Sequence, residues 1–214
     1  MNKIKISLLA IALFTLAIGC KKKIDNVSEL VTASYPDITI NGAQFVSIPV
    51  GGTFVDLGSA ASDSLTGEFS LQPISVTNDI DPTTPGFYTV QYSYKNKYGY
   101  ISTSTRFVLV TDVSDTLDYS GLYRRSTNNA PMNVVKVATG LYSTDNIGGS
   151  PGFEILAYFG QINDSTLIVP LQPTEAGDLY AINAKVTPSA SDTLLTWAIR
   201  NASFGTAQRT FSHQ

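Results

Sequence analysis

The chain has 214 residues, with 14 lysines and arginines against 17 aspartates and glutamates, and a formal net charge of −3 at pH 7. This acidic balance, with no basic cluster beyond one lysine triplet, argues against a nucleic-acid-binding protein. A single cysteine excludes an intrachain disulfide, and a single histidine leaves too few nitrogen and sulfur ligands for a zinc site.

The first twenty residues have the pattern of a secretory signal. Lys3 and Lys5 form a basic start, and residues 6–19 follow without a charge. This run is shorter than the ~20 apolar residues that a transmembrane helix needs. A small glycine stands at the cleavage position, directly before Cys20. We therefore expect residues 1–19 to be removed during export.

The segment "LAIGC", which ends at Cys20, resembles the lipobox of bacterial lipoproteins, although Ala17 stands where that motif usually has leucine. The resemblance implies that the Cys20 sulfur carries a diacylglyceride after cleavage and that the new amino terminus gains a further acyl chain. More than one acyl chain anchors a protein stably. The alternative is a free thiol at the end of an ordinary signal peptide. Residues 20–34 form the predicted tether, whose lysines 21–23 either contact anionic headgroups or serve as a solvated spacer.

Residues 35–111 are predicted to form one β-domain, because β-branched and aromatic residues alternate between Gly, Pro, Asn and Asp breaks. "DITI" and "QFVSIPVG" are expected to be opening strands, and "KNKYG" is expected to join two long antiparallel strands. The pieces "INGAQFVSIPVGGTFVDLGSAASD", "TPGFYTVQY" and "RFVLV" resemble the immunoglobulin-like (Ig-like) repeats of unknown function in bacterial surface proteins. This resemblance implies an Ig-like β-sandwich.

Tyr88, Val90, Tyr92 and Tyr94 fall on one face of the predicted strand, because successive side chains alternate between faces. Tyr88 follows a Pro-Gly corner, where a β-sandwich places a tyrosine whose hydroxyl bonds back to the backbone. We therefore expect Tyr88 to be a corner residue, and Tyr92 and Tyr94 to lie in the core or in a half-buried sheet.

An acidic linker at 112–118 precedes a second β-domain at 119–214. Short turns between its strand candidates predict antiparallel neighbours. The strand candidates are 121–127, 132–138, 153–162, 165–171, 178–187, 193–201 and 206–212. Six or seven strands in succession predict a meander, either a sandwich or a small barrel, and we favour the sandwich. The predicted fold class is therefore all-β, with an Ig-like β-sandwich followed by an antiparallel meander domain.

This second domain resembles the C-terminal domains of small lipoproteins encoded beside starch-utilisation-type glycan import systems in Gram-negative anaerobes. The resemblance carries no catalytic activity.

Catalytic residues are scarce. His213 is the next-to-last residue, where chains fray, so a Ser-His-Asp arrangement is not expected. Glycoside hydrolysis needs only two carboxylates, and Glu154, in "FEILAYF", is the most suggestive acid. We expect Glu154 instead to face outward from a strand. The prediction is therefore that the protein is not an enzyme and uses no cofactor.

Two kinds of modification or metal site are considered. Asn78, Asp79 and Asp81 in "TNDIDPT" are weak calcium candidates, because clustered oxygens suit calcium, but the same residues are ordinary turn formers. Four short Asp-Ser or Asp-Thr motifs resemble an O-glycosylation acceptor of the same bacterial group. Their hydroxyl residues are Ser64, Thr116, Ser165 and Thr193. Thr116, in the predicted linker, is expected to be the most accessible.

Aromatic side chains of the second domain are the candidates for binding sugars. They are Tyr142, Tyr158, Tyr180 and Trp197. Trp197 lies two residues from Leu195 and therefore shares its face, so we favour a core position for Trp197. Tyr142, beside a glycine-rich segment, is expected to be the better exposed candidate.

Two functions of different classes remain. The first is a non-catalytic, lipid-anchored glycan-binding accessory of a polysaccharide uptake system at the outer membrane, on a face that the sequence leaves open. The second is a structural spacer or a docking protein for an outer-membrane partner, with no glycan ligand. The predicted partners are therefore the membrane, through its lipid anchor, together with a polysaccharide or outer-membrane glycan importer proteins.

Overall fold

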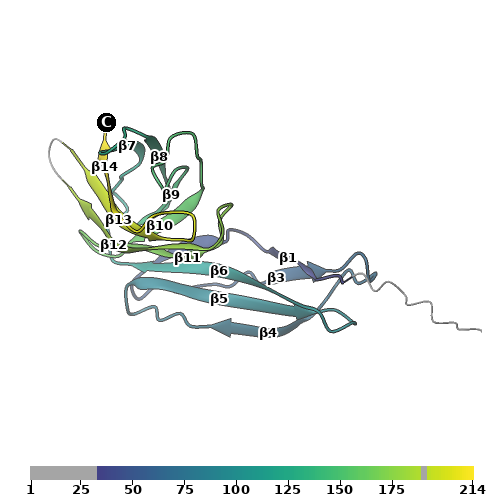
Figure 1. Cartoon of the computed structure of the whole chain (residues 1–214). Helices are drawn as coiled ribbons and strands as arrows, with labels where there is room; N and C mark the ends of the chain where they lie inside the picture. Colours follow the sequence, from purple (N-terminus) through teal and green to yellow (C-terminus); the bar gives the residue numbers. More distant parts are fainter. Residues whose placement is uncertain (1–32, 189–191) are drawn as a thin grey trace, which may run out of the picture. The chain divides into compact units, whose positions relative to one another are not determined.

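The structure is a computed structural model that describes residues 33–188 and 192–214. Cys20, the predicted signal peptide and nearly all of the predicted tether lie outside these residues. Ser34–Gln214 forms one compact unit. The described residues contain fourteen strands and no helix, which confirms the all-β fold class (Figure 1). Within the same residues, no helix has the length and apolar character needed to cross a membrane.

The first half of this unit is the Ig-like domain, built from a four-stranded sheet and a two-stranded sheet. The four-stranded sheet has the order β2-β6-β5-β4, and β2 runs parallel to β6. Antiparallel β1 and β3 form the second sheet. The strands are β1 (Asp37–Ile40), β2 (Phe45–Pro49), β3 (Ser59–Ser62), β4 (Pro73–Asn78), β5 (Gly86–Lys95) and β6 (Ile101–Thr111). Both expected opening strands and the long antiparallel pair are confirmed.

The two faces of β5 lie in different environments. Val90, Tyr92 and Tyr94 are buried in the core between the two sheets, as the two-residue period predicted. Tyr88 is a corner residue, because its hydroxyl donates a 2.8 Å hydrogen bond to the carbonyl of Thr84, four residues earlier. The alternate residues of β5 point to the opposite face of the sheet. The Ig-like core does not cover that face, so it is free for other contacts.

The second half is a closed antiparallel barrel with the strand order β10-β11-β12-β13-β14-β7-β8-β9. The strands are β7 (Gly121–Arg125), β8 (Pro131–Ala138), β9 (Leu141–Thr144), β10 (Ala157–Gln161), β11 (Leu167–Gln172), β12 (Leu179–Thr187), β13 (Leu194–Arg200) and β14 (Gln208–His213). The favoured sandwich is therefore wrong and the barrel alternative is right.

Two differences between the predicted and the observed strands account for the wrong choice of a sandwich. β9 was not predicted, and the strand expected at 153–162 begins only at Ala157. With β9 present, β8 and β10 each gain a neighbour, and β14 pairs with β7 through Phe211 and Arg125 to close the sheet. Closure removes the unpaired edges that two open sheets would leave.

The barrel interior is packed with aromatic side chains. Trp197 contacts Phe159 and Phe211, with ring centroids 5.6 and 5.1 Å apart, and its indole N–H donates to the carbonyl of Ile147 at 3.0 Å. Tyr123 is fully buried in the same cluster. These side chains fill the interior, as in other small barrels.

The barrel packs directly on the Ig-like sheet within the compact unit. The Phe45 ring stacks on Tyr158 of β10, with centroids 4.0 Å apart, and the Thr111 hydroxyl donates to the carbonyl of Gln161 at 2.6 Å. Gly160 permits the close approach, because a Cβ there would lie 2.6 Å from Leu109. The predicted linker also takes part in packing, since Leu117 contacts the barrel core.

Candidate functional site

A groove of about 580 Å³ runs between the outer face of β5 and β6 and the barrel strand β11. Its lining residues are Gln44, Phe87, Thr89, Gln91, Thr103, Ser104, Thr105, Phe107, Ile168, Pro170, Leu171, Gln172, Pro173 and Asp178. The volume lies within the ~300–1,000 Å³ range of small-molecule sites. We take this groove as the candidate functional site.

The floor of the groove combines neutral polar side chains with the aromatic Phe87 and Phe107 on the same strand faces. Thr89 and Gln91 come from β5, on the face opposite the buried tyrosines, and Thr103 and Thr105 come from β6. Gln91 and Thr105 are direct cross-strand partners, so an amide and a hydroxyl lie side by side. Such a floor offers hydrogen-bond donors and acceptors without charge.

The opposite wall is apolar. Pro170 and Leu171 belong to β11, where the pairing register with β12 shifts between Val169 and Gln172. A bulge of this kind re-aims side chains, and Leu171 is left 60% exposed. Gln172 is buried and bonds both the N–H and the carbonyl of Tyr158, at 2.8 and 2.7 Å, which holds β11 in place.

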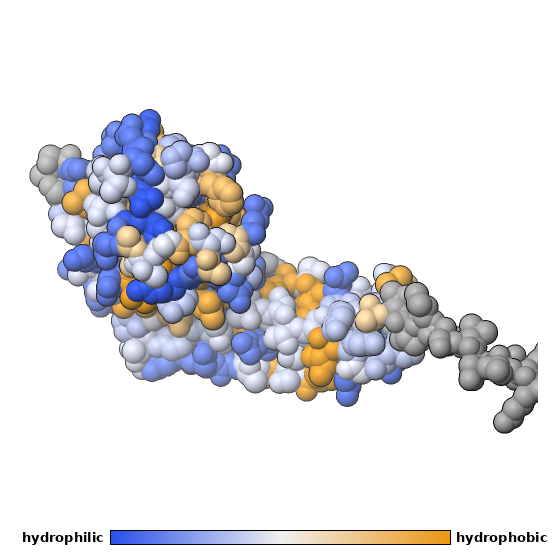
Figure 2. Space-filling model, viewed as in Figure 1, coloured by the Kyte–Doolittle hydropathy of each residue, from blue (hydrophilic) through white to orange (hydrophobic). Residues whose placement is uncertain are grey.

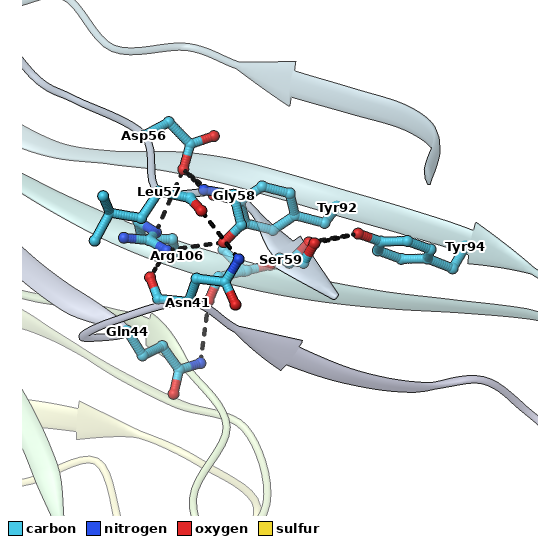
Figure 3. A network of polar contacts seen from close by, with 10 residues as sticks. Asn41, Gln44, Asp56, Leu57, Gly58, Ser59, Tyr92, Tyr94 and Arg106 are labelled. Carbon is cyan, nitrogen blue, oxygen red and sulfur yellow. Dashed lines mark hydrogen bonds and ion pairs between the residues drawn. The ribbon is translucent and has the colours of Figure 1, made fainter. Parts of the chain in front are cut away.

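A polar network inside the Ig-like domain fixes the segments that flank β2, next to the groove residue Gln44 (Figure 3). The buried Arg106 guanidinium donates to the carbonyls of Asn41 and Gly58, at 2.7 and 3.2 Å. Its Nε lies 3.8 Å from a carboxylate oxygen of Asp56. These contacts fix the segments on both sides of β2 and so place Gln44, whose amide donates to the carbonyl of Thr105 at 3.1 Å.

Tyr92 links this network to the core. Its hydroxyl donates a hydrogen bond to Asp56, while its ring is packed in the Ig-like core. Burial raises the pKa of Tyr92 to about 12, and the hydrogen bond to the Asp56 carboxylate acts in the same direction. Tyr92 therefore stays neutral at physiological pH and serves as a structural donor, not as a proton-transfer group.

The predicted aromatic candidates lie elsewhere. Tyr142, expected to be exposed beside a loop, is fully buried in β9, so that expectation is wrong. Trp197 is also fully buried, which confirms its core position and removes it as a sugar platform. Tyr158 is half-buried under Phe45. Tyr180, on β12, keeps 41% of its surface exposed and is the one that stays open to a ligand.

The side chains of the calcium candidates are already hydrogen-bonded, two of them within the turn and Asp79 to strand β5. Asn78 accepts the N–H of Ile80 at 2.9 Å, and Asp79 accepts the N–H of Thr89 at 2.5 Å. Asp81 accepts the hydroxyl and N–H of Thr83 at 2.7 and 2.9 Å, and these bonds hold the pKa of Asp81 below its usual value. The bonds of Asn78 and Asp81 are those of Asx turns, and the bond of Asp79 ties the turn to β5. Over the described residues, no group of three or more acids, histidines or cysteines is arranged to hold a metal ion.

The hydroxyl residues of the O-glycosylation motifs differ in accessibility. Ser64, Thr116 and Ser165 are exposed, whereas Thr193 is half-buried beside β13. The Thr116 hydroxyl is 2.8 Å from that of Ser114, within the segment that joins the two domains.

Glu154 lies in a loop, not on a strand, so its predicted secondary structure is wrong, although it is exposed as expected. It lines a shallow recess of about 320 Å³ together with Glu175 and Phe153. Both glutamates are exposed.

The sequence did not predict the groove residues, because the candidates considered were aromatic side chains for sugar binding and acids for catalysis. The available signal was the alternation of Thr and Gln on the face of β5 opposite the tyrosines, at Thr89 and Gln91, and of threonines at Thr103 and Thr105. Nothing in the sequence indicated that β11 would lie opposite this face.

Comparisons with known proteins bear on the first domain. Residues 38–110 match a family model described as "Bacterial surface protein, Ig-like domain". This match confirms the expected Ig-like domain and indicates a bacterial cell-envelope protein. A search of curated proteins finds no match to the sequence.

Two solved structures show weak similarity. One is a lipoprotein from Bacteroides thetaiotaomicron, at 19% identity and a TM-score of 0.38, covering 84% of this chain and 100% of that chain. The other is the M60 catalytic domain with two CBM51 domains of ZmpB from Clostridium perfringens, at 14% identity and a TM-score of 0.28, covering 85% of this chain and 21% of that chain. Scores this low carry no inference about function.

Proposed function

We propose that this protein is a non-catalytic glycan-binding protein of the bacterial envelope, anchored by lipid at Cys20, and that the groove between β5, β6 and β11 holds the glycan. In this proposal it is an accessory of a polysaccharide uptake system at the outer membrane. The composition of the groove is the observation that supports this function best. Neutral amides and hydroxyls of β5 and β6 line one side together with Phe87, and prolines and Leu171 of the barrel line the other.

This composition suits a neutral sugar. Hydroxyl groups of a sugar ring need partners that both donate and accept, and glutamine and threonine side chains do both. The C–H faces of the ring need apolar contact, which Leu171 and Pro170 provide. The partly exposed Phe87 adds an aromatic side chain to the groove lining.

The non-catalytic part of the proposal rests on the acids. Glycoside hydrolysis uses a pair of carboxylates flanking the bond that is cleaved. Among the residues that line the groove, Asp178 is the single charged side chain. One carboxylate can orient a sugar hydroxyl but cannot supply both an acid and a nucleophile or base.

Calorimetric titration of the full chain in detergent with laminarin, xylan, pullulan and mannan tests this function. Calorimetry is used in place of tryptophan emission, because Trp197 is buried in the barrel interior and would report poorly on binding in the groove. If one polysaccharide binds, we expect Gln91→Ala to weaken it about tenfold, which is ~1.4 kcal/mol and typical of a lost hydrogen bond. Gln208→Ala, at an exposed glutamine on β14, is the matched control and should bind normally.

Each other outcome changes the assignment. An equal loss in both variants would move the site away from the groove. No binding to any of the four polysaccharides would contradict the glycan proposal and favour the docking function. That alternative has its own observation, because β4 is an edge strand whose six residues are all exposed and could pair with a strand of a partner.

A further inference from the structure

One end of the Ig-like domain presents exposed apolar side chains around the turn between β5 and β6. We call this set the tip. It consists of Tyr35, Leu65, Phe69, Tyr98 and Ile101, each at least half exposed. Figure 2 shows apolar surface, in orange, at the end of the domain that carries this turn. Exposed apolar side chains gathered at one place mark a contact surface.

Hydrogen bonds join the three segments that form the tip. The Ser34 hydroxyl donates to the buried Asp63 carboxylate at 2.6 Å. The Asn96 side-chain amide donates to Asp63 and to the carbonyl of Ser34, both at 2.8 Å. The Lys97 N–H donates to Glu68 at 3.0 Å, and its ammonium group donates to the carbonyl of Thr66. The apolar side chains are therefore presented by a fixed frame.

Several N–H groups of the turn are already paired. The N–H groups of Tyr98 and Tyr100 donate to the Asn96 side-chain oxygen, at 3.1 and 3.0 Å, and the Asn96 N–H donates to the Tyr100 carbonyl at 3.0 Å. Tyr35 and Tyr100 also contact each other, with ring centroids 5.1 Å apart. A low-dielectric surface could cover this turn without leaving these N–H groups unpaired.

We propose that the tip rests on the surface of a lipid bilayer, with its apolar side chains among the headgroups. The inference rests on the proposed acylation of Cys20. The chain enters the domain at Ser34, which is bonded into the tip, and Cys20 lies fourteen residues earlier. That length spans at most about 50 Å when fully extended, so an anchored chain keeps the tip within reach of the membrane.

The composition of the tip favours lipid over a protein partner. Tyrosine is enriched at membrane interfaces, where its ring lies among acyl chains and its hydroxyl in water. The exposed Lys95 and Lys97 flank the turn and can reach lipid phosphates, as can lysines 21–23. The two acids of this region are already bonded: the Glu68 carboxylate to Thr66 and to the Lys97 N–H, and the Asp63 carboxylate to Ser34 and Asn96.

The geometry also links the tip to the groove. Gln91 lies five residues from Asn96 along the extended strand β5, which is about 17 Å at the usual rise per residue. A tip seated on the membrane would therefore hold the groove a short distance above the lipid surface.

Tryptophan quenching in vesicles tests the proposal. Tyr98→Trp and Leu65→Trp place a reporter at two positions of the tip, and Tyr180→Trp places a matched reporter on the exposed face of β12. The full acylated chain is reconstituted into vesicles of phosphatidylethanolamine and phosphatidylglycerol that contain brominated lipid. We expect the two tip variants to lose up to about half of their emission, because each has one reporter at the interface and the buried Trp197 as a constant background. The Tyr180→Trp variant and the unaltered protein should keep theirs.

The outcomes separate the tip from the anchor and from the glycan site. If acylated protein floats with the vesicles but neither tip variant is quenched, the proposal is overturned, and the tip is left for a protein partner. If the acylated chain does not float, or the Cys20→Ala chain floats equally well, the anchoring on which the inference rests is overturned. Polysaccharide titration of the same variants reports on the groove independently, since Tyr98 and Leu65 do not line it.

Discussion

The Ig-like domain and the barrel are both built mainly from antiparallel strands, yet they bury different interiors. The core between the two Ig-like sheets is small, with Ala61, Val90, Tyr92 and Tyr94 as its buried members. The barrel encloses a larger cluster around Trp197. Buried polar contacts occur in both halves, around Arg106 and Asp63 in the Ig-like domain and around Arg209 in the barrel, but the barrel adds extensive aromatic packing in a sheet without edges.

This difference is reflected in what each half can offer a ligand. A closed barrel that is filled with side chains has its inner face occupied. An open sheet buries one face and leaves the other available, and the face of β5 that carries Gln91 lines the groove. The barrel contributes a rigid wall, and the Ig-like sheet contributes the polar floor.

The largest expected effect comes from the barrel interior. Trp197→Ala should lower the free energy of unfolding by about 3–5 kcal/mol, because the packed rings around it can collapse only partly into the space left. Urea unfolding followed by circular dichroism measures the change, with Val135→Ala on the exposed outer face as the control. A loss below ~1 kcal/mol would show that the interior is less tightly packed than the structure indicates.

The Ig-like domain should be most sensitive at the buried Arg106, which pairs with the partly exposed Asp56. Arg106→Leu leaves Asp56 without its cation and the Asn41 carbonyl without its donor, while the Gly58 carbonyl keeps the Asn41 N–H, so we expect a loss of about 3 kcal/mol. Adding Asp56→Leu to the Arg106→Leu chain should recover part of that loss, because the uncompensated charge is then gone. If the double variant is as unstable as the sum of the two single variants, the network does not act as a pair.

Both halves contain a tyrosine whose hydroxyl donates to the backbone carbonyl four residues earlier, so the two bonds can be compared directly. Tyr123, fully buried, donates its hydroxyl to the carbonyl of Tyr119 at 2.9 Å, and the partly exposed Tyr88 makes the same bond to Thr84 at 2.8 Å. Burial raises the pKa of both hydroxyls, more strongly for Tyr123. We expect Tyr123→Phe to cost about 1–2 kcal/mol and Tyr88→Phe less than ~1, since water can replace the exposed bond. Equal losses in parallel urea titrations would contradict the assigned difference in burial.

The last effect is confined to acid pH. Hydrogen bonds from Ser34 and Asn96 hold the pKa of Asp63 below its usual value. A lowered carboxylate pKa adds stability that is fully present above the unfolded value of about 3.9 and is lost as the pH falls through the folded pKa. Stability should therefore fall more steeply below about pH 4 in the unaltered chain than in Asp63→Asn. Urea midpoints of both chains, measured across this pH range, check the prediction. If Asp63 does not contribute, the two midpoints plotted against pH would follow parallel curves.

Local sequence patterns were enough to predict many strands but not their closure. The alternation in β5 placed Tyr92 and Tyr94 in the core, and the Pro-Gly corner placed Tyr88 correctly. The short strand β9 was overlooked because "LYST" lies between two glycine-rich turns and has too few residues to show a period. Its omission led to the wrong choice of a sandwich and to the wrong expectation that Tyr142 is exposed.

The groove could not be predicted for a different reason. Its floor and its wall are separated by more than sixty residues of sequence, and neither Gln91 nor Leu171 carries a motif of its own. The sequence by itself determined the β-class, the Ig-like pattern of residues 38–110 and the polarity of each strand face, because these depend on local alternation and turn residues. Only the tertiary structure decided that β14 returns to β7, that Gly160 admits Leu109, and that the polar face of β5 meets β11. Those contacts are set by packing between distant segments, which no local pattern encodes.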